Sequence, residues 1–342
     1  MTAVKAVFWV SLAALVWTYV LYPAIWALLA RLAPRRVRRA DFEPAVTVIV
    51  AAFNEEQVIE RRVANLRALD YPPEKLELVV TSDASSDRTE ELAEAAGARV
   101  IRNPRGGKVA AQDRAVRETE GEIVAFSDAN ASWSPDALRM LVRNFADPDV
   151  AYVCGQLKIQ RADGSNKEGV YWRYELAVRD AESRLGSVTG GNGSIYAVRR
   201  ADYVEVDPRF GHDLSLPYLM VQRGRRAVYE PEALAFEKPT PTNEAEYRRK
   251  VRMFEHCWLI VLRGKMLRRL GPLYAVEIVS HRLLRYGSGL LHVVLLATSF
   301  ALVTHGWVYA VVLAAQLLLL LAAGVGVGIA RYYVLVSWAT VQ

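Results

Sequence analysis

The feature that most constrains this chain is the distribution of its charges, which leaves two long apolar segments near its ends. Residues 6–30 contain no Lys, Arg, Asp or Glu, and residues 286–330 contain none either. A bilayer core of about 30 Å is crossed by roughly 20 apolar helical residues. The first segment is therefore long enough for one span. The second is long enough for two, with a turn at residues 304–306, and the apolar tail 332–342 fits either an interfacial helix or the start of another span.

Basic residues indicate which side of the membrane the middle of the chain faces. Five arginines follow the first apolar segment: Arg31, Arg35, Arg36, Arg38 and Arg39. Because arginines beside a span favour the cytoplasmic side, we expect a multi-pass protein of the cell (inner or plasma) membrane with residues 31–285 in the cytosol. The alternative is a cleaved signal peptide, whose apolar region would be shorter, about 7–15 residues.

The net charge of +6 does not predict a nucleic-acid partner. Basic residues concentrate at 31–39 and 248–269, beside the apolar segments, where attraction to anionic membrane lipids explains them more simply. The only cysteines are Cys154 and Cys257, which form neither a disulfide framework nor a metal-binding spacing. A reducing compartment fits them.

Strands and helices alternate in the first half of the charged middle. We predict strands at 46–52, 76–80, 99–101 and 122–126, and helices at 54–69, 87–96 and 108–118. Such alternation favours an α/β fold with a mostly parallel sheet covered by helices on both faces. Further on we predict strands at 150–159, 194–198 and 227–230, helices at 168–185 and 213–223, and basic amphipathic helices on the membrane surface within 244–285.

Polar residues follow three of the predicted strands. Asn54 and Glu55 follow the first strand, Asp83 the second, and Asp128 and Asn130 the fourth. Ligands of open parallel sheets bind at the carboxyl ends of the strands. Asp and Asn are also ordinary turn residues, but three such ends on one sheet edge favour a binding site over turns alone.

Asp128 and Asn130 predict a site for Mg²⁺ or Mn²⁺. Residues two apart in an extended segment share a face, and both side chains offer the oxygen ligands that hard cations prefer. An alternative for Asn130 is that it caps a helix beginning near Ser134.

Charged residues at three other places are candidate site residues. Lys108 follows two glycines at the start of a helix, where anions such as phosphate bind. Asp213 begins another helix, as a general base or only as an N-cap. Arg249 and Arg252 share a helix face, where they either clamp a phosphate group or face lipid.

Together these motifs resemble the inverting glycosyltransferases of family 2, especially the membrane-bound branch related to cellulose and hyaluronan synthases. The resemblance covers residues 44–260 and the flanking spans. The segments that carry it are 48–55 (VIVAAFNE), 82–89 (SDASSDRT), 107–108 (GK), 127–130 (SDAN), 190–193 (GGNG), 212–213 (HD) and 249–252 (RKVR).

The resemblance implies a GT-A fold and a role for each candidate residue. Asp83 looks like the contact to the nucleotide base, Asn54 and Glu55 like the loop beside the nucleoside, and Lys108 like a further nucleotide contact. Asp128 looks like the first acid of the Asp-x-Asp metal motif. Asp213 looks like the catalytic base, and Arg249 and Arg252 fall where the synthases carry Gln-x-x-Arg-Trp.

Four positions depart from the family pattern. Asn130 replaces the second metal acid, which leaves one metal ligand uncharged. His212 stands where an acidic residue often precedes the base, and Asp113 where the helix motif Lys-x-x-Ala-x-Asn has its Asn. Met253 replaces the Trp of Gln-x-x-Arg-Trp, which puts processive synthesis in doubt.

We therefore predict four regions: a transmembrane helix at 1–31, a GT-A glycosyltransferase domain at 44–236, amphipathic interfacial helices at 237–285 and a C-terminal transmembrane region at 286–342. The expected activity moves a sugar from a nucleotide diphosphate sugar, by resemblance a UDP-sugar, to a saccharide or lipid-linked acceptor at the cytosolic membrane face, in polysaccharide or glycan synthesis. Expected partners are the donor, the acceptor, membrane lipids and proteins of assembly or export. The alternative is a non-catalytic membrane protein that binds sugar nucleotide or polysaccharide and assists assembly or export.

Overall fold

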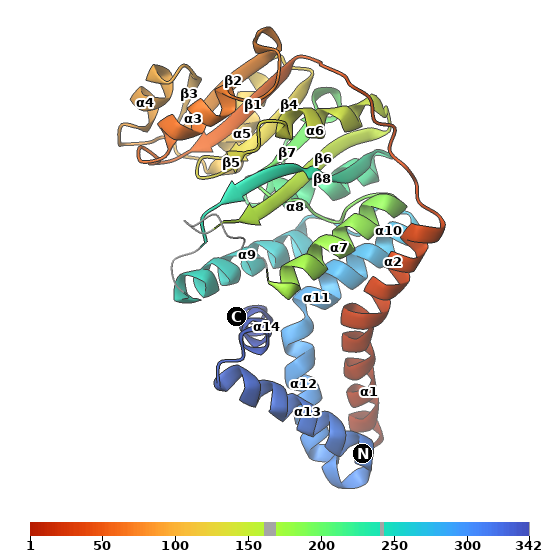
Figure 1. The fold of residues 1–342 in the computed structure, drawn as a ribbon. Coiled ribbons are helices and arrows are strands. Elements are labelled where there is room, and N and C mark those ends of the chain that lie inside the picture. The colour runs from red at the N-terminus through yellow and green to blue at the C-terminus, as the bar shows by residue number, and fades with distance from the viewer. Residues whose placement is uncertain (161–168, 240–242, 342) are drawn as a thin grey trace.

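The computed structural model describes residues 1–160, 169–239 and 243–341. Figure 1 shows an α/β unit at one end, a bundle of apolar helices at the other, and three helices between them: α7 (Val170–Leu185), α9 (Asn243–Arg263) and α10 (Pro272–Glu277). The strands of the α/β unit are β1 (Val46–Ala52), β2 (Leu76–Asp83), β3 (Arg99–Asn103), β4 (Ile123–Asp128), β5 (Ser132–Trp133), β6 (Val150–Ile159), β7 (Tyr196–Arg199) and β8 (Arg226–Glu237).

These strands form one sheet in the order β3-β2-β1-β4-β7-β6-β8-β5. The first four strands in this order are parallel, and β7 runs antiparallel to both β4 and β6. The register brings the strand ends level, since Ala51 of β1 lies opposite Asp128 of β4 and Ala52 lies opposite Ser82 of β2. The predicted parallel sheet edge is confirmed. Strand β6 has the predicted bounds, whereas β8 is longer than predicted and β5 was not predicted.

Both faces of the sheet are covered by helices, as alternating side chains in buried strands require. Val48 and Val50 face one core, whereas Ile49 faces the other. The helices of the α/β unit are α3 (Ile59–Arg67), α4 (Thr89–Ala95), α5 (Lys108–Arg117), α6 (Ala137–Val142), α7 (Val170–Leu185) and α8 (His212–Gln222). Helices α3 and α6 pack on the Val48 face, and α5 and α8 on the Ile49 face.

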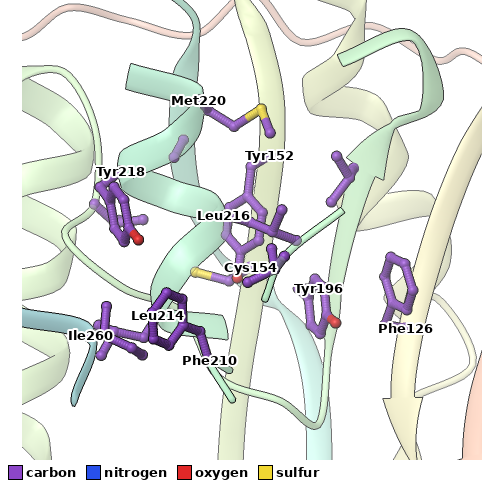
Figure 2. Close-up of a cluster of buried hydrophobic side chains, with 14 of the residues drawn as sticks. Phe126, Tyr152, Cys154, Tyr196, Phe210, Leu214, Leu216, Tyr218, Met220 and Ile260 are labelled. Carbon is purple, nitrogen blue, oxygen red and sulfur yellow. The ribbon is translucent and has the colours of Figure 1, made fainter. Parts of the chain in front are cut away.

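The core on the Ile49 face joins the sheet to α8 and α9. Figure 2 shows Tyr152 and Tyr196 of the sheet beside Leu216 of α8, with Ile260 of α9 (Asn243–Arg263) nearby. The rings of Phe126 on β4 and Tyr196 on β7 stack 4.8 Å apart, so the sheet beside the predicted site is tightly packed on this face.

Two sequence expectations about helices need correction. The helix predicted at 54–69 begins only at Ile59, so Asn54 lies before it. Asn130 does not cap the next predicted helix, since α6 begins at Ala137 and Asp136 precedes it. The helix predicted from Glu168 is α7, which begins at Val170, and Glu168 itself lies outside the described residues.

Within the described residues, three helices are long and apolar enough to cross a membrane: Thr2–Leu32, Ser288–His305 and Trp307–Gly324. The first comprises α1 (Thr2–Val16), a π-helical turn and α2 (Tyr22–Leu32). The others correspond to α12 (Ser288–Leu302) and α13 (Trp307–Gly324), and α1 packs along α12. The remaining helices of this part are α10 (Pro272–Glu277), α11 (Leu284–Tyr286) and α14 (Gly328–Ala339).

The arginines after the first apolar helix contact the α/β unit. Arg35 pairs with Asp149 at 2.8 Å, and Arg39 pairs with the buried Glu230 at 3.3 Å. Exposed ion pairs contribute little stability each, but here they fix the linker along the protein surface. These arginines therefore have a structural role as well as the one predicted beside the membrane.

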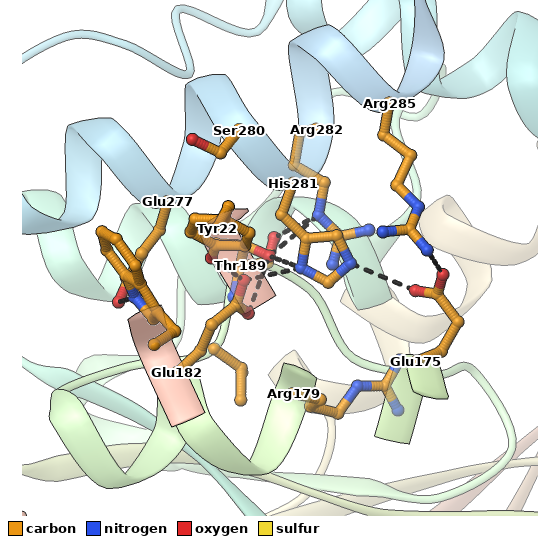
Figure 3. Close-up of polar contacts among 12 residues, drawn as sticks. Tyr22, Glu175, Arg179, Glu182, Thr189, Glu277, Ser280, His281, Arg282 and Arg285 are labelled. Carbon is orange, nitrogen blue, oxygen red and sulfur yellow. Dashed lines mark hydrogen bonds and ion pairs between the residues drawn. The ribbon is translucent and has the colours of Figure 1, made fainter. Parts of the chain in front are cut away.

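A buried polar cluster connects the first apolar helix to the α/β unit (Figure 3). The carboxylate of Glu182 on α7 accepts hydrogen bonds from the Tyr22 hydroxyl at 2.6 Å and the Thr189 hydroxyl at 3.1 Å, and its other close partner is His281 Nδ1 at 2.6 Å. The Arg282 guanidinium donates to the Thr189 carbonyl at 3.2 Å. Thr189 begins the glycine-rich segment 189–194, so the cluster anchors the segment that borders the candidate site.

Candidate active site

The loops after β1 and β2 are joined at the sheet edge. The amide nitrogen of Ser86 donates to Asn54 Oδ1 at 2.9 Å, and that of Glu55 donates to the Thr89 hydroxyl at 2.7 Å. Asn54 and Ala84 have positive φ angles of 54° and 62°, a region that among non-glycine residues Asn adopts most readily. Asn54 therefore positions the loop that carries Glu55.

Asp83 is buried and organises the glycine loop before α5. Its carboxylate accepts hydrogen bonds from the Arg105 guanidinium at 2.7 Å and from the amides of Gly106 at 2.7 Å and Gly107 at 3.0 Å. The same Arg105 guanidinium lies 3.4 Å from the centre of the partly exposed Phe53 ring. Arg105 and Phe53 were not predicted, although an exposed Phe next to Asn54 was a usable signal.

Lys108 and Asp128 meet at the centre of the edge. The Lys108 ammonium donates to Asp128 Oδ1. Desolvation acts to lower the pKa of Lys108, but the nearby carboxylates of Asp128, Asp213 and Glu237 outweigh it and the pKa is raised. A Cβ added to Gly193 would lie 3.2 Å from the ammonium nitrogen and 3.4 Å from Asp128 Oδ2, so the glycine keeps this space open.

Asp213 is the second residue of α8 and belongs to the same site. Its charge acts on Lys108, and its backbone carbonyl accepts a hydrogen bond from the Gly191 amide at 2.7 Å. Lys108 and Asp128 are thus in direct contact, and the charge of Asp213, from a third element, acts on the same ammonium.

His212, which precedes Asp213, and Asp113 both depart from the family pattern, and they contact each other. His212 Nε2 lies 3.1 Å from Asp113 Oδ1, and the ring is also held at 3.2 Å by the Tyr196 hydroxyl. The Tyr203 hydroxyl donates to the same Asp113 oxygen. His212, which precedes the predicted base Asp213, and Asp113 on α5 therefore form one buried pair.

A buried arginine lies behind Asp128 and was not predicted. Arg62 is 2% exposed, and its Nη2 donates to the Ser127 hydroxyl at 2.7 Å. Burial lowers its pKa to about 9, which the Asp128 carboxylate opposes, so it remains a cation at neutral pH. Its position on the apolar stripe of α3 was the only sequence signal, and an arginine there ordinarily suggests a solvated side chain.

Glu55 and Glu237 add negative charge around Asp128. Burial raises the pKa of Glu55, and the charge of Asp128 raises it further. Glu237 ends β8, and its carboxylate accepts a hydrogen bond from the Ser194 hydroxyl, which also lies 3.4 Å from Asp128 Oδ2. Glu237 was not predicted because it is distant in sequence from every motif of the site.

The predicted arginine pair, Arg249 and Arg252, lies on α9. Both residues are exposed on α9, and the charge of Arg249 lowers the pKa of Glu237, whose net shift is upward because burial dominates. Arg252 lies one turn further along the helix, where its carbonyl faces His256 Nδ1 at 3.0 Å. The charge of Arg249 therefore reaches the acidic residues of the edge.

The chemistry of the edge fits a divalent cation, although the described part of the chain contains no group of three or more His, Cys, Asp or Glu side chains placed to hold a metal. The Lys108 ammonium already occupies a cation position against Asp128, and the surrounding donors are oxygens. Asn130 is exposed in the turn after β4, two residues beyond Asp128.

Known proteins are similar to this chain in sequence and in fold. Residues 47–206 match the family described as Glycosyl transferase family 2. The chain is 28% identical over 291 residues to the N-acetylglucosaminyltransferase of Rhizobium meliloti, covering 75% of this chain and 67% of that protein. It is 32% identical over 163 residues to the beta-monoglucosyldiacylglycerol synthase of a Synechocystis strain, covering 44% of this chain and only 33% of that protein.

Among solved structures, the mannosyltransferase PcManGT from Pyrobaculum calidifontis, in complex with GDP-Man and Mn²⁺, superimposes with a TM-score of 0.76 at 24% identity. The match covers 98% of this chain and 96% of that one. The chain thus has an α/β fold of the GT-A type, and its residues 47–206 are similar to family 2 glycosyltransferases. The prediction that it is a glycosyltransferase, made from the order of its motifs, is confirmed at this level.

Proposed function

We propose that the chain is an inverting glycosyltransferase that transfers a sugar from a nucleotide diphosphate sugar to a saccharide or lipid-linked acceptor at the cytosolic face of a membrane, in polysaccharide or glycan synthesis. The observation that carries this proposal is the convergence of Lys108, Asp128 and Asp213 at the edge where β1, β2 and β4 end. The relation to the cellulose and hyaluronan synthase branch, and a UDP-sugar as the donor, rest on the sequence resemblance.

The donor is held along the sheet edge. The stacked Phe53 and Arg105 offer a flat surface beside Asp83 for the nucleotide base, next to the loop of Asn54 and Glu55. Lys108 and Arg249 supply positive charge for the diphosphate, and cations at this point stabilise the negative charge that develops on the leaving group. A divalent Mg²⁺ or Mn²⁺ held by Asp128, with Asn130 as the predicted second ligand, would supply Lewis-acid stabilisation of that charge.

Asp213 acts as the general base. Its carboxylate takes the proton from an acceptor hydroxyl, whose oxygen attacks the anomeric carbon from the face opposite the nucleotide. The new glycosidic bond forms as the bond to the diphosphate breaks, so the configuration at that carbon inverts. The Gly191 amide fixes the backbone of Asp213 and thereby helps to orient this carboxylate.

The position of the site next to apolar helices supports a membrane-associated acceptor and a multi-pass topology. Helix α9 packs on α8, which begins at the base, and it also contacts α11 and α14. The arginines after the first apolar helix favour a cytosolic location for the α/β unit. Membrane lipids and proteins of assembly or export are the partners that this arrangement favours.

Replacing Asp213 by Asn tests the proposal, with nucleotide diphosphate release from a panel of UDP- and GDP-sugars as the readout. We expect release to fall by about 10²–10⁴-fold, the usual contribution of a general base, while nucleotide binding measured by calorimetry is retained. Asp207→Asn is the matched control, because Asp207 pairs with Arg209 in the same segment outside the site. Wild-type turnover in D213N would refute the base assignment, and no release from any donor by the unaltered protein would favour the non-catalytic binding role.

A further inference from the structure

The two residues that the sequence assigns to the cation are not equivalent in the structure. Asp128 lies at the end of β4 against Lys108, whereas Asn130 is exposed in the following turn and has no charge to offer. Divalent cations bind more tightly as the number of charged oxygen ligands rises. A site of Asp128 and Asn130 alone would be weak for Mg²⁺ or Mn²⁺.

A second carboxylate, at the end of strand β8, lies close to Asp128. Strand β8 pairs with β5, with Phe236 opposite Ser132, so its last residue passes close to the turn that follows β4. That residue is Glu237, whose Oε1 accepts the Ser194 hydroxyl. Asp128 Oδ2 lies 3.4 Å from the same hydroxyl oxygen. The two carboxylates therefore flank one atom.

The two carboxylates share one hydrogen-bond donor, the Ser194 hydroxyl. A serine hydroxyl has a single hydrogen, so Ser194 can donate to only one of the two carboxylates at a time. Two carboxylates this close repel each other unless a positive charge lies near both. In the structure that charge comes from Lys108, bonded to Asp128, and from Arg249, whose charge acts on Glu237.

We propose that Glu237 is the second carboxylate ligand of the divalent cation, in the place that the sequence pattern gives to Asn130. The proposal rests on the proposed function, because that function is the reason to expect a cation at Asp128. Asp128 and Glu237 would hold the cation between them, and its charge at Asp128 would release the Lys108 ammonium to bind the diphosphate. Gly193 leaves room for this exchange, since a side chain there would contact both Lys108 and Asp128.

Mn²⁺ binding to the full chain in detergent tests the proposal, with the electron paramagnetic resonance signal of free Mn²⁺ as the readout, in separate series with UDP and with GDP. We expect Glu237→Gln, which keeps the shape of the side chain, to weaken Mn²⁺ binding by about tenfold or more because it removes one charged ligand. Asn130→Ala should change the Kd by less than about threefold, since it removes only a neutral oxygen. Glu232→Gln is the matched control, because Glu232 is an exposed residue of the same strand paired with Arg143.

Thermal unfolding of each variant shows whether a loss of Mn²⁺ binding reflects loss of folding. If E237Q is unstable, Glu237→Asp is used instead, and we expect it to recover part of the affinity because it keeps the charge. The proposal is overturned if E237Q binds Mn²⁺ like the unaltered chain, if N130A loses more affinity than E237Q, or if the unaltered chain binds no Mn²⁺ with either nucleotide. Because no transfer is measured, Mn²⁺ binding through Glu237 in a chain that moves no sugar would sink the proposed function and leave this ligand assignment standing.

Discussion

Gly191 is the position where the structure makes its sharpest mutational prediction. A Cβ built on this glycine would lie 2.0 Å from the hydroxyl oxygen of Tyr152, 3.0 Å from the adjoining ring carbon and 3.2 Å from Cys154 Cβ. Tyr152 is fully buried and stacked 5.7 Å from the Tyr196 ring, so it cannot easily move away. Space, and not backbone conformation, therefore excludes a side chain at Gly191.

The expected cost of Gly191→Ala follows from overpacking a rigid core, about 1–3 kcal/mol of the free energy of unfolding. For a unit of 150–250 residues, each kcal/mol lowers the melting temperature by roughly 2–4 °C, so we expect a fall of about 4–8 °C for a loss near 2 kcal/mol. Relief of the clash would also pull the Gly191 amide from the Asp213 carbonyl, so turnover should fall as well.

A second substitution separates the clash from other effects. The Tyr152 hydroxyl is buried and has no hydrogen-bond partner among the described residues, so Tyr152→Phe alone should be neutral or stabilising by up to about 1 kcal/mol. In the double variant the phenylalanine removes the 2.0 Å contact but leaves the tight one with the ring carbon, so we expect partial recovery of stability.

Thermal unfolding of the detergent-solubilised chain, followed by tryptophan fluorescence, measures all three variants. Gly271→Ala is the control, because nothing lies within 4 Å of a Cβ built there and the residue has φ −66°. A melting temperature of G191A equal to that of the unaltered chain, or a double variant no more stable than G191A, would refute the reasoning.

Two further predictions concern buried groups near the site. Burial raises the pKa of the Cys154 thiol to about 11 and that of Cys257 above its ordinary value. At pH 8 only roughly a thousandth of Cys154 would be thiolate, against about a quarter for a free cysteine, so neither thiol should react with maleimide until the chain is denatured; rapid labelling of both in the folded chain would contradict this. In the His212–Asp113 pair, His212→Gln and Asp113→Asn should each lower kcat about tenfold with little change in the donor KM, because they disturb the support of Asp213 and not the nucleotide site. In a double-mutant cycle the two should couple by about 0.5–3 kcal/mol, whereas strictly additive losses would show that the pair does not act as a unit.

The sequence by itself determined the class of fold and the edge of the sheet at which the site lies. Buried β-branched strands alternating with amphipathic helices predicted β1 to β4 and α3 to α5, because local periodicity records which faces are buried. Asp83 and Asp128 followed directly, since residues that end parallel strands share an edge. The order of the motifs then gave the glycosyltransferase domain, and the uncharged segments gave the three helices long enough to cross a membrane.

The tertiary structure decided which side chains complete the site. Glu237 and Asp128 lie beside the same Ser194 hydroxyl because β8 pairs with β6 and with β5, segments roughly 75–105 residues earlier in the chain. Arg62 is a buried cation, and His212 contacts Asp113, because of packing between segments that are distant in sequence. Asn54, which the predicted helix 54–69 included, lies before that helix and accepts a hydrogen bond from the Ser86 amide across the sheet edge. Asn130, which local rules offered as a helix cap, lies outside α6, which begins only at Ala137. Periodicity along a chain reports burial, but contacts between distant segments depend on how the whole chain is folded.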